Sequence, residues 1–205
     1  NGLIDLAQSR LGSKIIYKTD EFFAPAKRII NPWPPVFKEG VFDKHGKWMD
    51  GWESRRSFGR KQRVQSGSEL DWCILRLGIP GIIHGFDIDT LHFRGNAPEF
   101  VSVEAANIEG EVDENTQWTE ILTRSPAQAH SQNLFDCESS KVWTHLRLNM
   151  FPDGGIARFR AYGEGQVKRE NFIDGELLDW SVDISSLIEA MKMGPKFYKS
   201  VQRDI

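Results

Sequence analysis

The chain has 205 residues, of which 40% are hydrophobic, and a formal net charge of −3. This length allows one sizeable domain with a buried core, and this composition excludes a disordered chain. The nearly balanced charge gives no sign of a nucleic-acid partner, and no apolar run approaches the roughly 18 residues that a membrane-spanning helix needs.

The two cysteines are isolated from each other in the sequence. Cys73 lies in an apolar run and Cys137 in a polar one, without the CxxC spacing of a metal or redox site. Such cysteines suit a reducing compartment. No segment resembles a signal peptide, and the final Arg-Asp-Ile is not a peroxisomal signal. We therefore expect a cytoplasmic location.

Short runs of alternating hydrophobicity predict β-strands along most of the chain. We expect Gly78 and Pro80 to end one strand, the prolines of residues 31–37 to keep that segment irregular, and the Asp-Gly-Gly sequence at 153–155 to form a hairpin turn. The expected strands are residues 13–19, 71–78, 81–93, 99–106, 117–123, 142–150 and 156–163.

About seven short strands without intervening helices predict an all-β, antiparallel jelly-roll sandwich. This domain should cover residues 1–163. Residues 164–205 have a different character, since Ile184, Leu187, Ile188 and Met191 share one helical face. We expect a linker and a short C-terminal amphipathic helix there.

Residues 48–56 combine acidic and basic side chains with aromatic ones. Glu53 lies close to Arg55 and Arg56 in a segment without strand alternation. A solvated loop with local salt bridges is one interpretation, and a loop that carries function is the other.

Residues 86–96 place two carboxyl groups on the same side of a strand. Asp87 and Asp89 are two residues apart, and Asn96 follows in the next loop. Such a pair can share a proton, activate water or hold a divalent ion. No HxH or HExxH spacing accompanies the acids, so a metal is possible but not specified. His92 and His130 are interpreted as rim or core residues.

Arg158 and Arg160 lie at alternate positions of an expected strand, about 7 Å apart along it. Two guanidinium groups on one face repel each other unless an anion or carboxylates lie between them. A substrate anion and internal salt bridges explain this pair equally well.

Taken together, several long motifs resemble the allantoicase family, specifically the first of its two tandem repeats. They are TDEFFAPAKRII at 19–30, GKWMDGWESRR at 46–56, DWCILRLG at 71–78, GFDIDTLHFRGN at 85–96, VSVEAAN at 101–107 and THLRLNMFPDGGIARFRAYG at 144–163. The resemblance implies a galactose-binding-domain-like jelly roll. It also implies a hydrolase of carbon–nitrogen bonds that converts allantoate to ureidoglycolate and urea in purine breakdown.

This implied function suggests roles for the polar clusters. We expect Glu53, Asp87 and Asp89 to transfer protons. We expect Arg55, Arg56, Arg158 and Arg160 to bind the substrate carboxylate, with Asn96 on a ureido carbonyl.

The chain carries one copy of the repeat motifs, and residues 194–205 carry none of those of a second copy. We expect a homo-oligomer or association with a second repeat, and neither a nucleic-acid nor a membrane partner. No cofactor is required by the sequence. The alternative function is a single-repeat, non-catalytic module that binds a small anion, a sugar or a protein.

Overall fold

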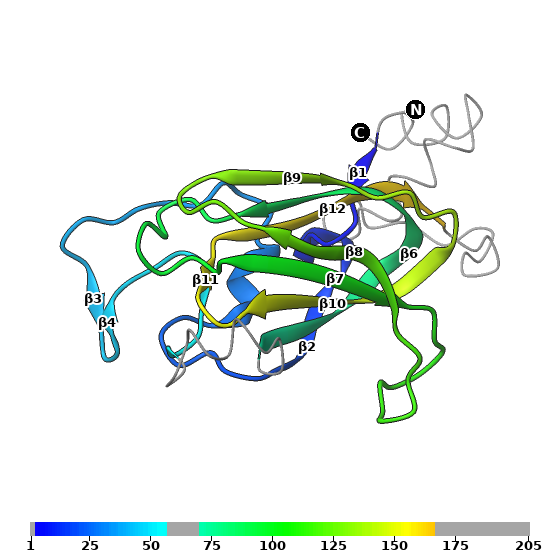
Figure 1. Ribbon diagram of the computed structural model, residues 1–205, viewed down its shortest axis with the longest axis horizontal. Coiled ribbons are helices and arrows are strands. Elements are labelled where there is room, and N and C mark those ends of the chain that lie inside the picture. The colour runs from blue at the N-terminus through cyan, green and yellow to red at the C-terminus, as the bar shows by residue number, and fades with distance from the viewer. Residues whose placement is uncertain (1–2, 57–69, 167–205) are drawn as a thin grey trace, which may run out of the picture.

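One long strand connects the two layers of a β-sandwich (Figure 1). The computed structural model describes residues 3–56 and 70–166, so the expected linker and C-terminal helix lie outside the described residues. The strand β6 spans Asp71–Asp89. Its first part, residues 71–76, pairs with β2 and most of β10. Its second part, residues 81–89, pairs with β12 and β9, and the start of β10 pairs with residues 81–82.

The pairings define two antiparallel layers. One layer has the order β2-β6-β10-β7-β8 and the other has the order β1-β12-β6-β9. The bounds are Ile4–Asp5 for β1, Lys14–Lys18 for β2, Phe100–Ala106 for β7, Thr119–Pro126 for β8, Gln132–Asp136 for β9, Val142–Phe151 for β10 and Arg158–Gly165 for β12. The predicted all-β sandwich is confirmed.

Gly78 and Pro80 do not end the strand, so that part of the prediction is wrong. They lie where β6 bends from one layer to the other. The pairing of β6 with β10 is interrupted in this stretch, between Arg76 and Gly81. A Cβ on Gly78 would lie 1.8 Å from the carbonyl oxygen of Leu11, so glycine lets the backbones approach there.

The hairpin expected at residues 152–155 is also wrong. Within the described residues, β10 and β12 both pair with β6 and not with each other. The connection instead contains the short strand β11 (Gly155–Ile156), which pairs with β5 (Trp52–Glu53). A glycine-rich turn signal fixes local backbone conformation but not which strands become neighbours.

The hydrophobic core fills the space between the layers. Phe86 of β6 stacks on Phe159 of β12 with ring centroids 5.8 Å apart. Leu146 and Leu148 of β10 are buried on the facing side. Alternate residues of β6 and β12 therefore point outward, which places Asp87, Asp89, Arg158 and Arg160 on the outer face of the second layer.

Loops and two short 3-10 helices cover the outer faces. These helices are η1 (Ser9–Leu11) and η2 (Ala26–Ile30). Beyond η2 the chain forms an arm that ends in the small hairpin of β3 (Phe42–Asp43) and β4 (Gly46–Lys47), which projects from one end of the sandwich in Figure 1. Within residues 3–56 and 70–166, no helix has the length and hydropathy needed to cross a bilayer.

Gly155 provides a test of this packing. A Cβ at that position would lie 2.0 Å from the ring of Phe93, which is completely buried. We expect Gly155→Ala to lower the free energy of unfolding by about 1–3 kcal/mol, since overpacking forces neighbours to shift. Gly95→Ala is the control, because a Cβ there meets nothing within 4 Å. Equal stability of both variants in urea unfolding would contradict the close approach.

Candidate functional site

A cavity of about 650 Å³ lies at the end of the sandwich that carries the arm. Three parts of the chain form its wall: the segment from Phe23 to Glu53, residues 92–96 after β6, and His130 before β9. Its volume is typical of a site for a small molecule. Polar groups converge there with the aromatic ring of Phe37.

Glu53 is the acid of this cavity. Backbone bonds fix its position, since its N–H donates to the carbonyl of Ala24 and its own carbonyl accepts the N–H of Ala24. The amide of Asn96 donates to Glu53 Oε1 at 2.6 Å. Burial raises the pKa of Glu53, while the Asn96 hydrogen bond and the charge of Arg56 lower it and Asp43 raises it. Burial thus makes the neutral form of Glu53 easier to reach than for an exposed glutamate, which suits the group to proton transfer.

The side chains of Arg55 and Arg56 have different partners. The guanidinium of Arg56 donates to the carbonyl of Gly95, beside Asn96, and its charge acts on Glu53. Arg55 instead forms an ion pair with Asp20 at 2.7 Å. Its guanidinium carbon lies 5.2 Å from the ring centroid of Phe22. The structure therefore places Arg56 next to the cavity and gives Arg55 an internal partner.

His92 and His130 contribute an unexpected feature of the cavity. Both have positive φ angles, 74° and 55°, in the left-handed region that non-glycine residues rarely adopt. The backbone N–H of His92 donates to Nδ1 of His130 at 2.9 Å. In neutral His130 the ring proton therefore lies on Nε2, which can donate to a ligand. Strained backbone of this kind often marks a functional site.

Sequence reasoning gave these histidines no role in a site. His92 follows the expected acid pair by three residues, so its neighbourhood was visible in the sequence. His130 enters the cavity from another loop, and only its contact with His92, with ring centroids 5.9 Å apart, identifies it. No local pattern could have indicated that contact.

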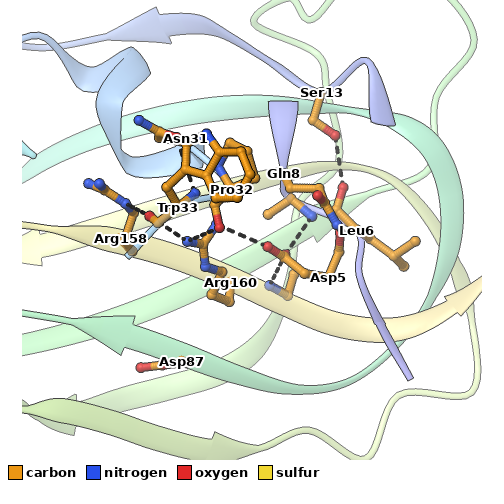
Figure 2. A network of polar contacts seen from close by, with 12 residues as sticks. Asp5, Leu6, Gln8, Ser13, Asn31, Pro32, Trp33, Asp87, Arg158 and Arg160 are labelled. Atoms are coloured by element: carbon orange, nitrogen blue, oxygen red, sulfur yellow. Dashed lines mark hydrogen bonds and ion pairs between the residues drawn. The ribbon is translucent and has the colours of Figure 1, made fainter. Parts of the chain in front are cut away.

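Arg158 and Arg160 do not line the cavity, and Figure 2 shows that both lie beneath residues 31–33. Arg158 is 2% exposed and donates to Asp50 Oδ2 at 2.7 Å and to the carbonyls of Trp33 and Pro34. Arg160 pairs with Asp5 at 3.2 Å and donates to the carbonyl of Trp33. The positive charges of the two guanidinium groups are therefore neutralised by carboxylates of the protein itself.

The contacts of Arg158 hold in place two segments that lead to the wall of the cavity. Asp50 precedes Gly51, Trp52 and Glu53 in the sequence, and Asp50 Oδ2 also accepts the backbone N–H of Val36 at 2.9 Å. One buried guanidinium thus ties the segment before Glu53 and the segment before Phe37 to β12.

Asp87 and Asp89 lie opposite these arginines across the β6–β12 pair. Asp89 is in register with Arg158 and Asp87 with Arg160. Asp89 accepts the N–H of Leu91 at 2.7 Å. Burial raises its pKa, and the Leu91 hydrogen bond and the charges of Arg158, His92 and Arg160 lower it. Asp89 ends β6, three residues before His92.

Asp87 is not among the residues that line the cavity. Its Oδ2 accepts from Gln132 at 3.0 Å, and its buried Oδ1 has no hydrogen-bond partner within the described residues. Burial, and then the charge of Asp89, raise the pKa of Asp87 to about 6.

A divalent metal ion would need several carboxylate, imidazole or thiolate ligands close together. Residues 3–56 and 70–166 contain no group of three or more His, Cys, Asp or Glu side chains that could hold a metal ion. Glu53 with Asn96 in the cavity, and Asp87 with Asp89 on the outer face of the β6–β12 pair, form separate clusters.

Known proteins share both this sequence and this fold. A family model described as the allantoicase repeat matches residues 4–166. The chain belongs to the allantoicase family. A protein named probable allantoicase from Pseudomonas fluorescens is 50% identical over 161 residues, which cover 78% of this chain and 46% of that protein. The chain spans about half the length of the curated relatives it matches.

Solved structures agree with this assignment. Allantoicase from Saccharomyces cerevisiae matches with a TM-score of 0.69 and 35% sequence identity, over 82% of this chain and 50% of the other. A family 32 carbohydrate-binding module from C. perfringens, solved with galactose, matches with a TM-score of 0.50 and 15% identity, over 78% and 98% of the two chains. The second likeness shows the fold alone, and the allantoicase repeat is thus a jelly roll of the galactose-binding type.

The buried ion pair gives a first test of the site's support. We expect Arg158→Met to lower the free energy of unfolding by about 3–5 kcal/mol, because Asp50 would keep a buried, unpaired charge. The double variant Arg158→Met/Asp50→Asn should recover part of this loss, as a double-mutant cycle in urea would measure. Additive losses would show that the two side chains do not interact.

Asp87 gives a second test, through pH. Its pKa is about 6 in the folded protein against an ordinary value of 3.8, so the folded state holds this proton more tightly than the unfolded chain. Ionisation therefore lowers stability as pH rises from about 4 to 6, and the cost remains above that range. At about 1.4 kcal/mol per pH unit, the full cost is roughly 3 kcal/mol.

Asp87→Asn should remove this cost. We expect the variant to match the wild type near pH 4 and to exceed it in stability at pH 7. Denaturant unfolding across this range measures the difference, with Asp136→Asn on the exposed part of β9 as the control. A stability gap that does not change with pH would contradict the assignment.

Proposed function

We propose that this chain forms a site that hydrolyses allantoate to ureidoglycolate and urea, in the cytoplasm. The observation that carries the proposal is Glu53, held by Asn96 within a cavity of about 650 Å³ in a chain of the allantoicase family. Burial raises the pKa of this carboxyl group, which suits it to proton transfer.

The substrate fits the chemistry of the cavity. Allantoate carries one carboxylate and two ureido groups on a single carbon. Arg94 lines the cavity and Arg56 lies at its edge, and we assign the carboxylate to this pair. We assign the ureido carbonyls to Asn96 and to the Nε2–H of His130, which is supported by the occupation of His130 Nδ1 by the backbone of His92.

The reaction needs one proton donated and one removed. Glu53 in its neutral form gives its proton to the ureido nitrogen as the carbon–nitrogen bond breaks, and urea departs. The oxygen of a water molecule forms the new bond to the central carbon, and its proton returns to the Glu53 carboxylate. Asp89 is absent from the wall of the cavity and belongs to the separate cluster with Asp87, so it takes no proton step in this proposal.

This mechanism changes the roles expected from the sequence. Arg158 and Arg160 become positioning residues, because they form ion pairs with Asp50 and Asp5 and donate their N–H groups to backbone carbonyls. Asp87 supports β9 through Gln132 rather than acting on the substrate. Arg55 anchors the Glu53 segment through Asp20.

The length of the relatives bears on the partners of the site. Because the chain spans about half of those proteins, we propose that a second repeat or a second copy of this chain completes the assembly. Phe42 on the projecting arm is 70% exposed and offers a contact for it.

Glu53→Gln tests the proposal. We expect urea release to fall by about 10²-fold or more, since the amide cannot transfer a proton. Stability in urea unfolding and binding of allantoate, measured by thermal shift, should stay close to the wild type. Glu39→Gln, the same change at an exposed position of the arm, is the control.

The assay should use this chain and a form extended at its C-terminus by a second repeat. Unchanged turnover in Glu53→Gln would remove Glu53 from the mechanism. Wild-type protein that binds allantoate in both forms but releases no urea would instead establish the non-catalytic binding module.

A further inference from the structure

A second cavity lies at the other end of β10, far along the strand from the candidate site. It has a volume of about 660 Å³ and is formed by η1, the bend of β6, residues 108–111 and the start of β10. The residues proposed for hydrolysis are absent from its wall. The two cavities therefore have separate walls.

His145 is the buried polar group of this wall, with 3% of its surface exposed. Its Nδ1 lies 2.9 Å from the hydroxyl oxygen of Thr144. That hydroxyl accepts the N–H of Ile108 at 3.0 Å and lies 3.2 Å from the carbonyl oxygens of Ala106 and Ile108. These carbonyls can only accept, and either of them can take the single hydroxyl proton.

This arrangement favours one tautomer of His145. With the Thr144 proton directed to a carbonyl, the proton of this hydrogen bond comes from His145 Nδ1. Nε2 then carries a lone pair, and within the described residues it is buried without a hydrogen-bond partner. Burial and the charge of Arg76 lower the pKa of His145, so the ring stays neutral, although Glu111 acts in the opposite direction. A buried acceptor without a donor is unusual enough to require an explanation.

Two positively charged side chains lie on the two strands to one side of His145. Arg76 is opposite His145 in the β6–β10 register, and Lys14 is opposite Arg76 in the β2–β6 register. Like charges at opposed positions of neighbouring strands are unfavourable. Among the ion pairs of the described residues, no carboxylate neutralises either side chain. Glu111 lines the same cavity and adds an acceptor at its exposed side.

We propose that this cavity binds a small carboxylate that also carries an O–H or N–H donor, such as a 2-hydroxy acid. The carboxylate pairs with Arg76, whose planar fork matches two carboxylate oxygens. The donor group satisfies Nε2 of His145. A simple carboxylate without a donor would leave this nitrogen unpaired and lose that part of the affinity.

Glycolate and acetate separate the two parts of the proposal, since both are small carboxylates and only glycolate has a hydroxyl group. Each is titrated into the full isotopically labelled chain at pH 7, and amide and histidine-ring NMR shifts are followed. We expect glycolate to cause saturable shifts at Thr144, His145 and Gly110, with acetate binding at least several-fold more weakly. Arg76→Gln should abolish the glycolate shifts.

Lys141→Gln is the matched control, since it removes one exposed positive charge just before β10 and should leave glycolate binding unchanged. Non-saturable shifts, or equal glycolate binding by Arg76→Gln, would overturn the site. Equal affinity for acetate, or a ring spectrum with the proton on Nε2, would overturn the role of His145. The wild-type spectrum reports the tautomer without any substitution, so the test does not depend on the folding of a variant.

Discussion

The buried contact between Arg158 and Asp50 is the constraint on which the candidate site depends. A guanidinium group within the protein requires several acceptors, and here they come from Asp50, Trp33, Pro34 and the neighbouring backbone. Those acceptors belong to the two segments that precede Phe37 and Glu53. Satisfying one buried charge therefore fixes two irregular segments against a regular strand, next to the short β5–β11 pair that carries Glu53.

This constraint also explains why the irregular segment is long and rich in proline. Residues 31–37 offer carbonyl oxygens to Arg158 and Arg160, and proline supplies a carbonyl without an N–H that would itself need a partner. The same pair of arginines could not be left under a sheet of apolar residues, because burial of unpaired charge is costly. The two arginines on β12 and the run of prolines thus form one structural unit, although they lie far apart in the sequence.

The strands were predictable because their alternation reflects local packing against a core, and the sequence also led to Glu53 and Asn96 as candidate site residues. Their mutual contact depends on segments 43 residues apart and could only be guessed. The arginine pair illustrates the limit, since sequence shows that anions are needed but not whether Asp5 and Asp50 or a ligand supplies them. His130 and the connection from β10 to β11 were missed because both depend on which distant segments become neighbours.

The pairing of β1 with β12 has a consequence for synthesis on the ribosome. Ile4 lies opposite Gly163, so the sheet is closed by joining segments near the two ends of the repeat. A nascent chain cannot form this pair, nor complete the layer that contains it, until residue 163 has left the exit tunnel. Throughout that interval the second part of β6 lacks its β12 neighbour, and its apolar face is available to chaperones or to premature association.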